Sequence, residues 1–205
     1  MEQYLNEFLL LATAITIALM SPGPDFAITV KQSLGYGKKY AIISSAGIGL
    51  GIAIHVTYTI LGFGLIITQI PVLFSTIKII GAFYLIYIGY KSFISGAMTL
   101  KNESISTKKT NYKKSFLLGF FTNLLNPKAV LFFLSIFTVV IDINTPFYIQ
   151  TLYGVFCILI NFFWYSIIAV LLVQDKSLLF FNLYGEIWNK VIGIILILFG
   201  ISIFF

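Results

Sequence analysis

Arginine is absent from this chain, and charged side chains of any kind are scarce. Charged residues make up 10% of the 205 residues and hydrophobic residues 59%, against about 25% and about 45–50% in soluble globular proteins. So few charges cannot surround a hydrophobic core with polar surface, and the mean hydropathy is +1.00. The composition excludes a water-soluble domain and indicates an integral membrane protein.

The lack of arginine also argues against nucleic acid as a partner. The net charge of +6 comes from 13 lysines, whereas the planar fork of arginine is the group best suited to phosphate and guanine. Most of the lysines lie between apolar blocks, which is the pattern that sets membrane topology. The basic charge therefore indicates a membrane and disfavours nucleic-acid binding.

Cysteine and histidine occur once each, as Cys157 and His55. A lone thiol forms neither an internal disulfide nor a dithiol redox couple. One histidine without a cysteine pair or an acidic cluster gives no metal site, and no nucleophile with a neighbouring base is evident in the apolar runs. We therefore expect no catalytic residues, no metal, no cofactor and no enzyme activity.

Six apolar stretches are long enough to cross a hydrocarbon core about 30 Å thick, which takes about 20 helical residues. They are continuously apolar rather than alternating, so helices are expected and strands are not. The chain starts with Glu2 and Glu7 where a signal peptide has basic residues, so we expect the first stretch to stay in the mature protein. The stretches lie near 4–30, 40–68, 72–98, 115–140, 147–173 and 187–205.

The lysines are concentrated on one side of this arrangement. The other side has only Lys78, and Lys128 falls within a stretch. Because basic loops stay in the cytoplasm, both termini are expected outside, in a multi-pass protein. The lysines in the connections after the first, third and fifth stretches are Lys31, Lys38, Lys39, Lys91, Lys101, Lys108, Lys109, Lys113, Lys114, Lys176 and Lys190.

A polar segment at 99–114 divides the chain into two halves, 1–98 and 115–205, with three stretches each. We interpret this segment as a basic cytoplasmic linker that is attracted to anionic lipid headgroups. An odd number of crossings in each half gives the halves opposite orientations. The predicted fold is therefore an all-α membrane protein of six transmembrane helices, built as two inverted three-helix repeats.

Proline interrupts the first stretch of each half. One interruption reads Ser21-Pro22-Gly23-Pro24-Asp25, and the other reads Asn123-Leu124-Leu125-Asn126-Pro127-Lys128. Proline lacks a backbone donor and clashes with the preceding turn, so both helices should break, with Pro22, Gly23, Pro24 and Pro127 as hinges. Broken helices at corresponding places in two halves indicate a transport site.

Aligning Pro24 with Pro127 gives Asp25 and Lys128 equivalent positions in the two halves. A charge deep in the bilayer costs at least about 2.5–3.5 kcal/mol and usually pairs or lines a pathway. We hypothesise that these two side chains face each other at the pseudo-symmetric centre. The alternatives are that Asp25 only complements a half-helix dipole and that Lys128 extends to the interface.

Four further polar residues near the breaks complete the predicted substrate and proton pathway. His55 could relay protons, with the alternative that it is a satisfied buried polar group. The four residues are Ser21, Asn123, Asn126 and His55.

Three motifs together resemble the LysE/RhtB family of amino-acid exporters across essentially the whole chain. They are Ser21-Pro22-Gly23-Pro24, the segment Gly119-Phe120-Phe121-Thr122-Asn123-Leu124-Leu125-Asn126-Pro127-Lys128, and the third-stretch pattern Lys78-Ile79-Ile80-Gly81-Ala82-Phe83-Tyr84-Leu85-Ile86-Tyr87-Ile88-Gly89. The resemblance implies a bacterial inner-membrane exporter of basic or small neutral amino acids or their derivatives, driven by the proton motive force as an antiporter. It further implies proton coupling at Asp25, because family members keep an acidic or amide residue after the Pro-Gly-Pro.

The expected partners are thus an amino-acid substrate, protons and the lipid bilayer, and the oligomeric state is left open, a homo-oligomer included. Two alternative functions remain open besides amino-acid export: export of inorganic cations, and a role as a membrane subunit without transport. The second leaves the paired broken helices unexplained.

Overall fold

The protein is helical in the computed structural model, which describes residues 2–69, 71–95, 110–142, 144–171, 175–201 and 204. Every long element in these ranges is an α-helix. The helices are α1 (Glu2–Met20), α2 (Pro24–Tyr36), α3 (Lys38–Gln69), α4 (Pro71–Ile94), α5 (Tyr112–Leu124), α6 (Pro127–Val140), α7 (Phe147–Leu171) and α8 (Asp175–Ile201).

Four of these helices are long and apolar enough to cross a membrane: α1, α3, α7 and α8. The α5–α6 pair passes the same test together, bent by 55° at its break, and brings the number to five. The prediction of an all-α multi-pass membrane protein is therefore confirmed. A total of six spans is not confirmed, because the apolar helix Ile79–Ile94 within the third predicted stretch, 72–98, is shorter than a span.

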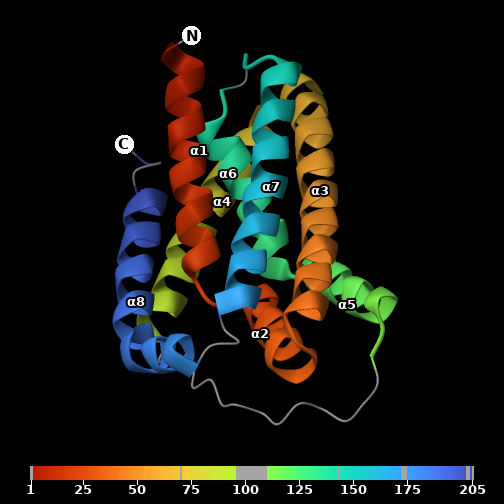
Figure 1. Ribbon diagram of the computed structural model, residues 1–205. Coiled ribbons are helices and arrows are strands. Elements are labelled where there is room, and N and C mark those ends of the chain that lie inside the picture. The colour runs from red at the N-terminus through yellow and green to blue at the C-terminus, as the bar shows by residue number, and fades with distance from the viewer. Residues whose placement is uncertain are drawn as a thin grey trace.

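The long helices pack side by side as a bundle, with α1, α7 and α3 in front in Figure 1. Behind them, α4 packs against α6 and α8. The front helix α3 packs against α5 and α7. The Glu2 end of α1 and the Ile201 end of α8 both point to the upper side of this view, while α2 and the start of α8 lie at the lower side. The two ends of the described chain therefore point to the same side of the bundle.

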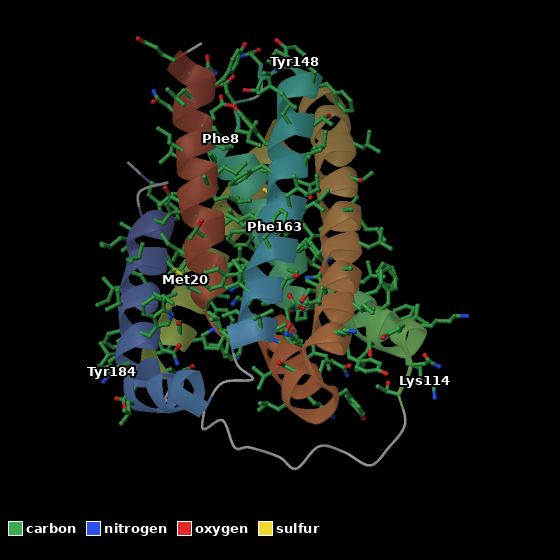
Figure 2. The ribbon with its side chains drawn as sticks, viewed as in Figure 1. Phe8, Met20, Lys114, Tyr148, Phe163 and Tyr184 are labelled. Atoms are coloured by element: carbon green, nitrogen blue, oxygen red, sulfur yellow. The ribbon has the colours of Figure 1, made fainter. Side chains whose placement is uncertain are left out.

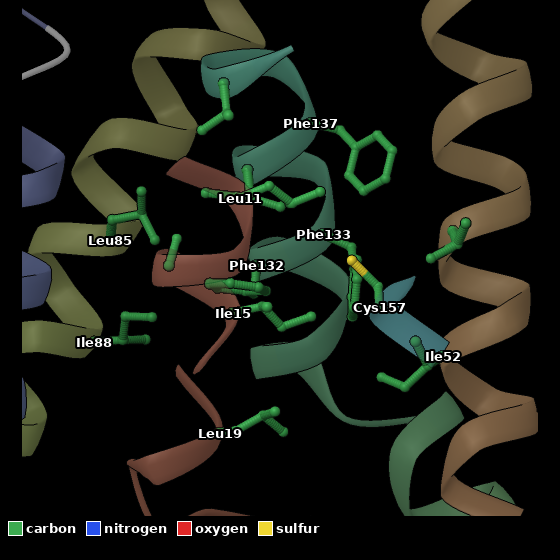
Figure 3. Close-up of a cluster of buried hydrophobic side chains, with 14 of the residues drawn as sticks. Leu11, Ile15, Leu19, Ile52, Leu85, Ile88, Phe132, Phe133, Phe137 and Cys157 are labelled. Carbon is green, nitrogen blue, oxygen red and sulfur yellow. The ribbon is translucent and has the colours of Figure 1, made fainter. Parts of the chain in front are cut away.

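Helix α6 lies in the core, since most of its side chains are apolar and most of them are buried. Phe132, Phe133 and Phe137 are at most 4% exposed, and Ile136 is fully buried. Figure 3 shows these phenylalanines among side chains of α1, α3, α4 and α7, with Cys157 beside Phe133. Cys157 is fully buried and behaves here as a small hydrophobic residue.

Close packing between α3 and α5 fixes the helix that carries Asn123. A Cβ added at Gly119 would overlap the backbone carbonyl of Ser44 on α3. Only glycine lets the two backbones approach this closely, as small residues do between membrane helices. The side of α5 that bears Asn123 is thereby held against α3.

Candidate functional site

Helix breaks lie at both predicted positions, and each break has the same design. Helix α1 ends at Met20 and α2 begins at Pro24, after the extended residue Gly23. Helix α5 ends at Leu124 and α6 begins at Pro127. In both cases proline is the first residue of the second helix, where its missing N–H is not needed. Asp25 and Lys128 consequently occupy the same place, one residue further on.

The carboxylate of Asp25 is bound by two amides from the other break. Its Oδ2 accepts hydrogen bonds from Asn123 Nδ2 at 2.9 Å and from Asn126 Nδ2 at 3.3 Å. Asp25 is only 7% exposed, and its Oδ1 is buried without a hydrogen-bond partner in the described part of the chain. An unpaired buried acceptor is costly, so this oxygen is a position where a proton or a donor group would be stabilised.

The ammonium group of Lys128 binds the end of α1. Its Nζ donates to the carbonyl oxygens of Ser21 at 2.9 Å and Ala18 at 3.4 Å. The last carbonyls of a helix have no partner within the helix and carry partial negative charge. Lys128 therefore compensates the negative end that the break creates.

Trp188 of α8 completes the capping of α1, and sequence reasoning gave it no role. Its Nε1 donates to the carbonyl of Met20 at 3.3 Å. The signal that was available is that an indole N–H near apolar surroundings normally has a partner. The sequence does not say which carbonyl that is.

Asp25 and Lys128 come close to the same place, and no ion pair joins them among the residues that the structure describes. Within the described ranges the one ion pair joins Lys190 to Glu186, on the exposed surface of α8. The amides of Asn123 and Asn126 already bind the carboxylate, and the α1 carbonyls already bind the ammonium group. Each charged side chain is thus bonded to the opposite break, and the two breaks are joined crosswise.

A small cavity of about 40 Å³ adjoins Asp25. It is lined by residues of both breaks, by Phe132 and Phe133 of α6, and by Asn161 and Tyr165 of α7. A water molecule has a share of about 30 Å³ in the liquid, so this cavity holds about one water.

A second cavity, of about 690 Å³, lies on the other side of the breaks. It is lined by Ser21, by the four hinge residues Pro22, Gly23, Pro24 and Pro127, and by the α4 side chains Tyr84, Tyr87 and Lys91. Gly23, Asn126 and Lys128 line both cavities. These three residues form the partition between a large cavity and a small one that contains the carboxylate.

His55 is placed beside the site and contacts Asn123 rather than Asp25. Its Nε2 lies 3.1 Å from the Asn123 backbone oxygen and its Nδ1 lies 3.0 Å from the Tyr58 hydroxyl. A carbonyl only accepts, so the contacts assign the proton to Nε2 and make Nδ1 the acceptor for Tyr58. The ring also stacks on Phe133. His55 therefore holds the Asn123 segment in place.

Gly51 of α3 is a second residue to which sequence reasoning gave no part in the site. A Cβ at this position would lie 2.5 Å from Asn123 Oδ1. The missing side chain leaves room for the Asn123 amide to lie between α3 and Asp25.

The structure thus gathers Asp25, Asn123, Asn126 and Lys128, adds Ser21 through its carbonyl, and places His55 one contact away. As for metals, no group of three or more His, Cys, Asp or Glu side chains comes together in the described part of the chain. The arrangement offers one carboxylate oxygen, one ammonium group and two amides at the meeting point of two helix breaks.

Comparison with known proteins places the chain among transporters. The family model described as LysE type translocator matches residues 16–205. The chain is 32% identical over 189 residues to the "Uncharacterized membrane protein YrhP" of Bacillus subtilis (strain 168), covering 88% of this chain and 90% of that one. It is 33% identical over 171 residues to the "Threonine efflux protein" of Escherichia coli (strain K12), with 80% and 81% covered.

A third relative is the "Leucine efflux protein" of Salmonella choleraesuis (strain SC-B67), 34% identical over 142 residues, or 69% of this chain and 66% of that one. No solved structure matches the chain. The family match spans both helix breaks and all four residues gathered between them. The protein therefore belongs to the LysE type translocator family, whose members are amino-acid efflux transporters and not enzymes.

Proposed function

We propose that this protein exports amino acids from the cytoplasm across the bacterial inner membrane by proton antiport. The observation that carries the proposal is the partition of Gly23, Asn126 and Lys128 between two cavities. One cavity is large enough for an amino acid and the other holds about one water beside an unpaired carboxylate oxygen. A substrate and a proton thus have separate places at one pair of helix breaks.

The large cavity suits the carboxylate of an amino acid at Lys128. An ammonium group has three donors, and Nζ uses two of them on Ser21 and Ala18. The third is left for a substrate carboxylate in the large cavity, which Lys128 lines. Substrate binding there engages the same ammonium group that caps α1, so it acts on the break itself.

Asp25 is the proposed proton carrier. With Oδ1 unpaired, the carboxylate gains a proton at the small cavity without losing its two amide bonds at Oδ2. A protonated Asp25 no longer attracts the substrate ammonium group. Protonation from the outside therefore favours release of the substrate, and loss of the proton to the cytoplasm resets the carrier.

The proposed mechanism is alternating access of two inverted three-helix repeats, 1–98 and 115–205. The support for the repeats is that Pro24 and Pro127 begin the second helix of each break in the same way. The large cavity reaches Lys91 and Ser95 at the end of α4, on the lysine-rich side that we assign to the cytoplasm. It would therefore admit substrate from inside, with both termini outside.

Efflux from bacteria preloaded with dipeptides tests the proposal, with wild type, Asp25→Asn and Lys128→Ala compared at equal expression. We expect wild type to accumulate at least one amino acid outside the cells and both variants to fail. Purified protein in liposomes with an imposed pH gradient then tests the coupling. Export of no amino acid by wild type contradicts the function, and export by Asp25→Asn that still follows the pH gradient contradicts the role of Asp25.

A further inference from the structure

Among the residues that the structure describes, the charges that line the large cavity are all of one sign. Lys91 and Lys128 are among its lining residues, and no aspartate or glutamate is among those that the structure describes. Asp25 lines the small cavity and not the large one. A cleft lined by one sign of charge concentrates the opposite sign and repels its own.

The charge of Lys91 is held at the wall of this cavity. Its Nζ lies 5.3 Å from the centre of the Tyr87 ring, on the preceding turn of α4. An ammonium group over an aromatic face is attracted by the ring. Lys91 therefore keeps a positive charge beside the route that leads from the end of α4 to Lys128.

The rest of the described lining carries no charge: it consists of rings and aliphatic side chains, with Ser21, Ser92, Ser95 and Asn126 as its polar members. Tyr84, Ile88 and Leu131 line it, and the Tyr84 hydroxyl donates to the Pro127 carbonyl at 3.4 Å. An aliphatic or hydroxylated side chain is well accommodated on such a surface. A second ammonium or a guanidinium group would be desolvated there without a carboxylate to pair with, which is strongly unfavourable.

We infer that the large cavity rejects amino acids with cationic side chains, lysine and arginine, and favours those without one. The inference rests on the proposed function and narrows the substrate of the same cavity. An α-carboxylate is matched by Lys128, and an α-ammonium group lies toward the Asp25 side of the partition. A cationic side chain then points at Lys91 and meets a like charge. A side-chain carboxylate meets no like charge at Lys91, so the rejection applies to cationic side chains.

The test measures export of leucine, threonine, lysine and glutamate by wild-type protein in liposomes under the same pH gradient. We expect leucine or threonine to leave at least about tenfold faster than lysine, because juxtaposed like charges cost several kcal/mol. Glutamate, whose side chain is not repelled by Lys91, should also leave faster than lysine. Lysine export as fast as that of the neutral amino acids or of glutamate overturns the inference and leaves the exporter intact. Export of none of the four overturns the proposed function, and the inference with it.

A charge reversal at the wall makes the test specific. Lys91→Glu should raise the ratio of lysine to leucine export by about tenfold, since it replaces a repulsion by an attraction. The matched control is Lys114→Glu, the same reversal on the exposed start of α5 (Figure 2), outside both cavities, which should leave the ratio unchanged. A ratio that does not move in Lys91→Glu, or that moves equally in Lys114→Glu, contradicts the assignment of selectivity to the cavity charge. The wild-type ratios decide the inference even where a variant does not fold.

Discussion

Two buried carboxylates, Asp25 and Glu7, belong to opposite ends of the first helix region and differ in how they are bonded. Both are almost fully buried, at 7% and 5% exposure. Both oxygens of Glu7 accept from the Thr145 hydroxyl at 2.9 Å, and Gln3 Nε2 adds a bond at 3.1 Å. Only one oxygen of Asp25 is bonded, and the other adjoins a cavity.

This difference in bonding distinguishes Glu7, an acid with a structural role, from Asp25, an acid with one oxygen available to a ligand. Glu7 also lies near the Tyr153 hydroxyl and the Asp142 backbone N–H, both at 3.4 Å. It therefore ties α1 to the α6–α7 connection and to α7, and a fully bonded buried group of this kind rigidifies the fold. The exposed fractions of the two carboxylates are similar and do not distinguish them. The number of hydrogen bonds to each carboxylate oxygen does.

The largest effect is expected from Asp25→Asn. The amide keeps the size of the side chain but cannot take up and lose a proton, so export driven by a pH gradient should fall by about tenfold or more, the range of typical coupling free energies. Downhill exchange of substrate without a gradient should fall much less. Transport in liposomes with and without the gradient measures both. A wild-type response to the gradient in Asp25→Asn would place the proton elsewhere.

The next effect is expected from Gly51→Ala. The new methyl group would push the Asn123 amide away from Asp25, and overpacking of this kind typically costs about 1–3 kcal/mol. We expect export to fall several-fold. The matched control is Gly62→Ala in the same helix, where an added Cβ meets nothing within 4 Å. Equal export rates in the two variants would show that the Asn123 position does not matter.

A smaller effect, on stability rather than coupling, is expected from Glu7→Gln. The substitution weakens the bonds to Thr145, so the free energy of unfolding should fall by about 1–3 kcal/mol, as for hydrogen bonds to charged groups. Thermal unfolding in detergent measures this, and Thr145→Val should lower the melting temperature in the same direction. Export by the folded fraction should still respond to the pH gradient. Loss of that response would remove the distinction between the two acids.

The smallest effect is expected from Lys190→Gln. Its partner Glu186 is exposed, 2.8 Å away and one turn earlier on α8. Exposed pairs of this type contribute little, so neither the melting temperature nor the export rate should change measurably. A clear loss of export would indicate that the surface of α8 takes part in the transport cycle.

Much of the fold and the position of the site could be predicted from the sequence because proline and charge have strong local consequences in a membrane. Pro24 and Pro127 determine where helices begin, and Asp25 and Lys128 follow directly. The partners of these residues could not be predicted, since they come from positions 98 and 107 residues away. Trp188 and Gly51 act through a ring nitrogen and an absent side chain, which no local pattern marks.

The crosswise bonds between the two breaks have a consequence for biogenesis. The Ser21 and Ala18 carbonyls that Lys128 binds are synthesised more than a hundred residues before it. While the first half enters the membrane, the Ser21 carbonyl has no lysine to bind and the Ala18 carbonyl has only the Ser21 N–H, 3.3 Å away, and unsatisfied backbone groups are costly in hydrocarbon. The N-terminal half therefore lacks part of its final hydrogen bonding when it leaves the ribosome. It reaches its final form only when the C-terminal half is inserted beside it.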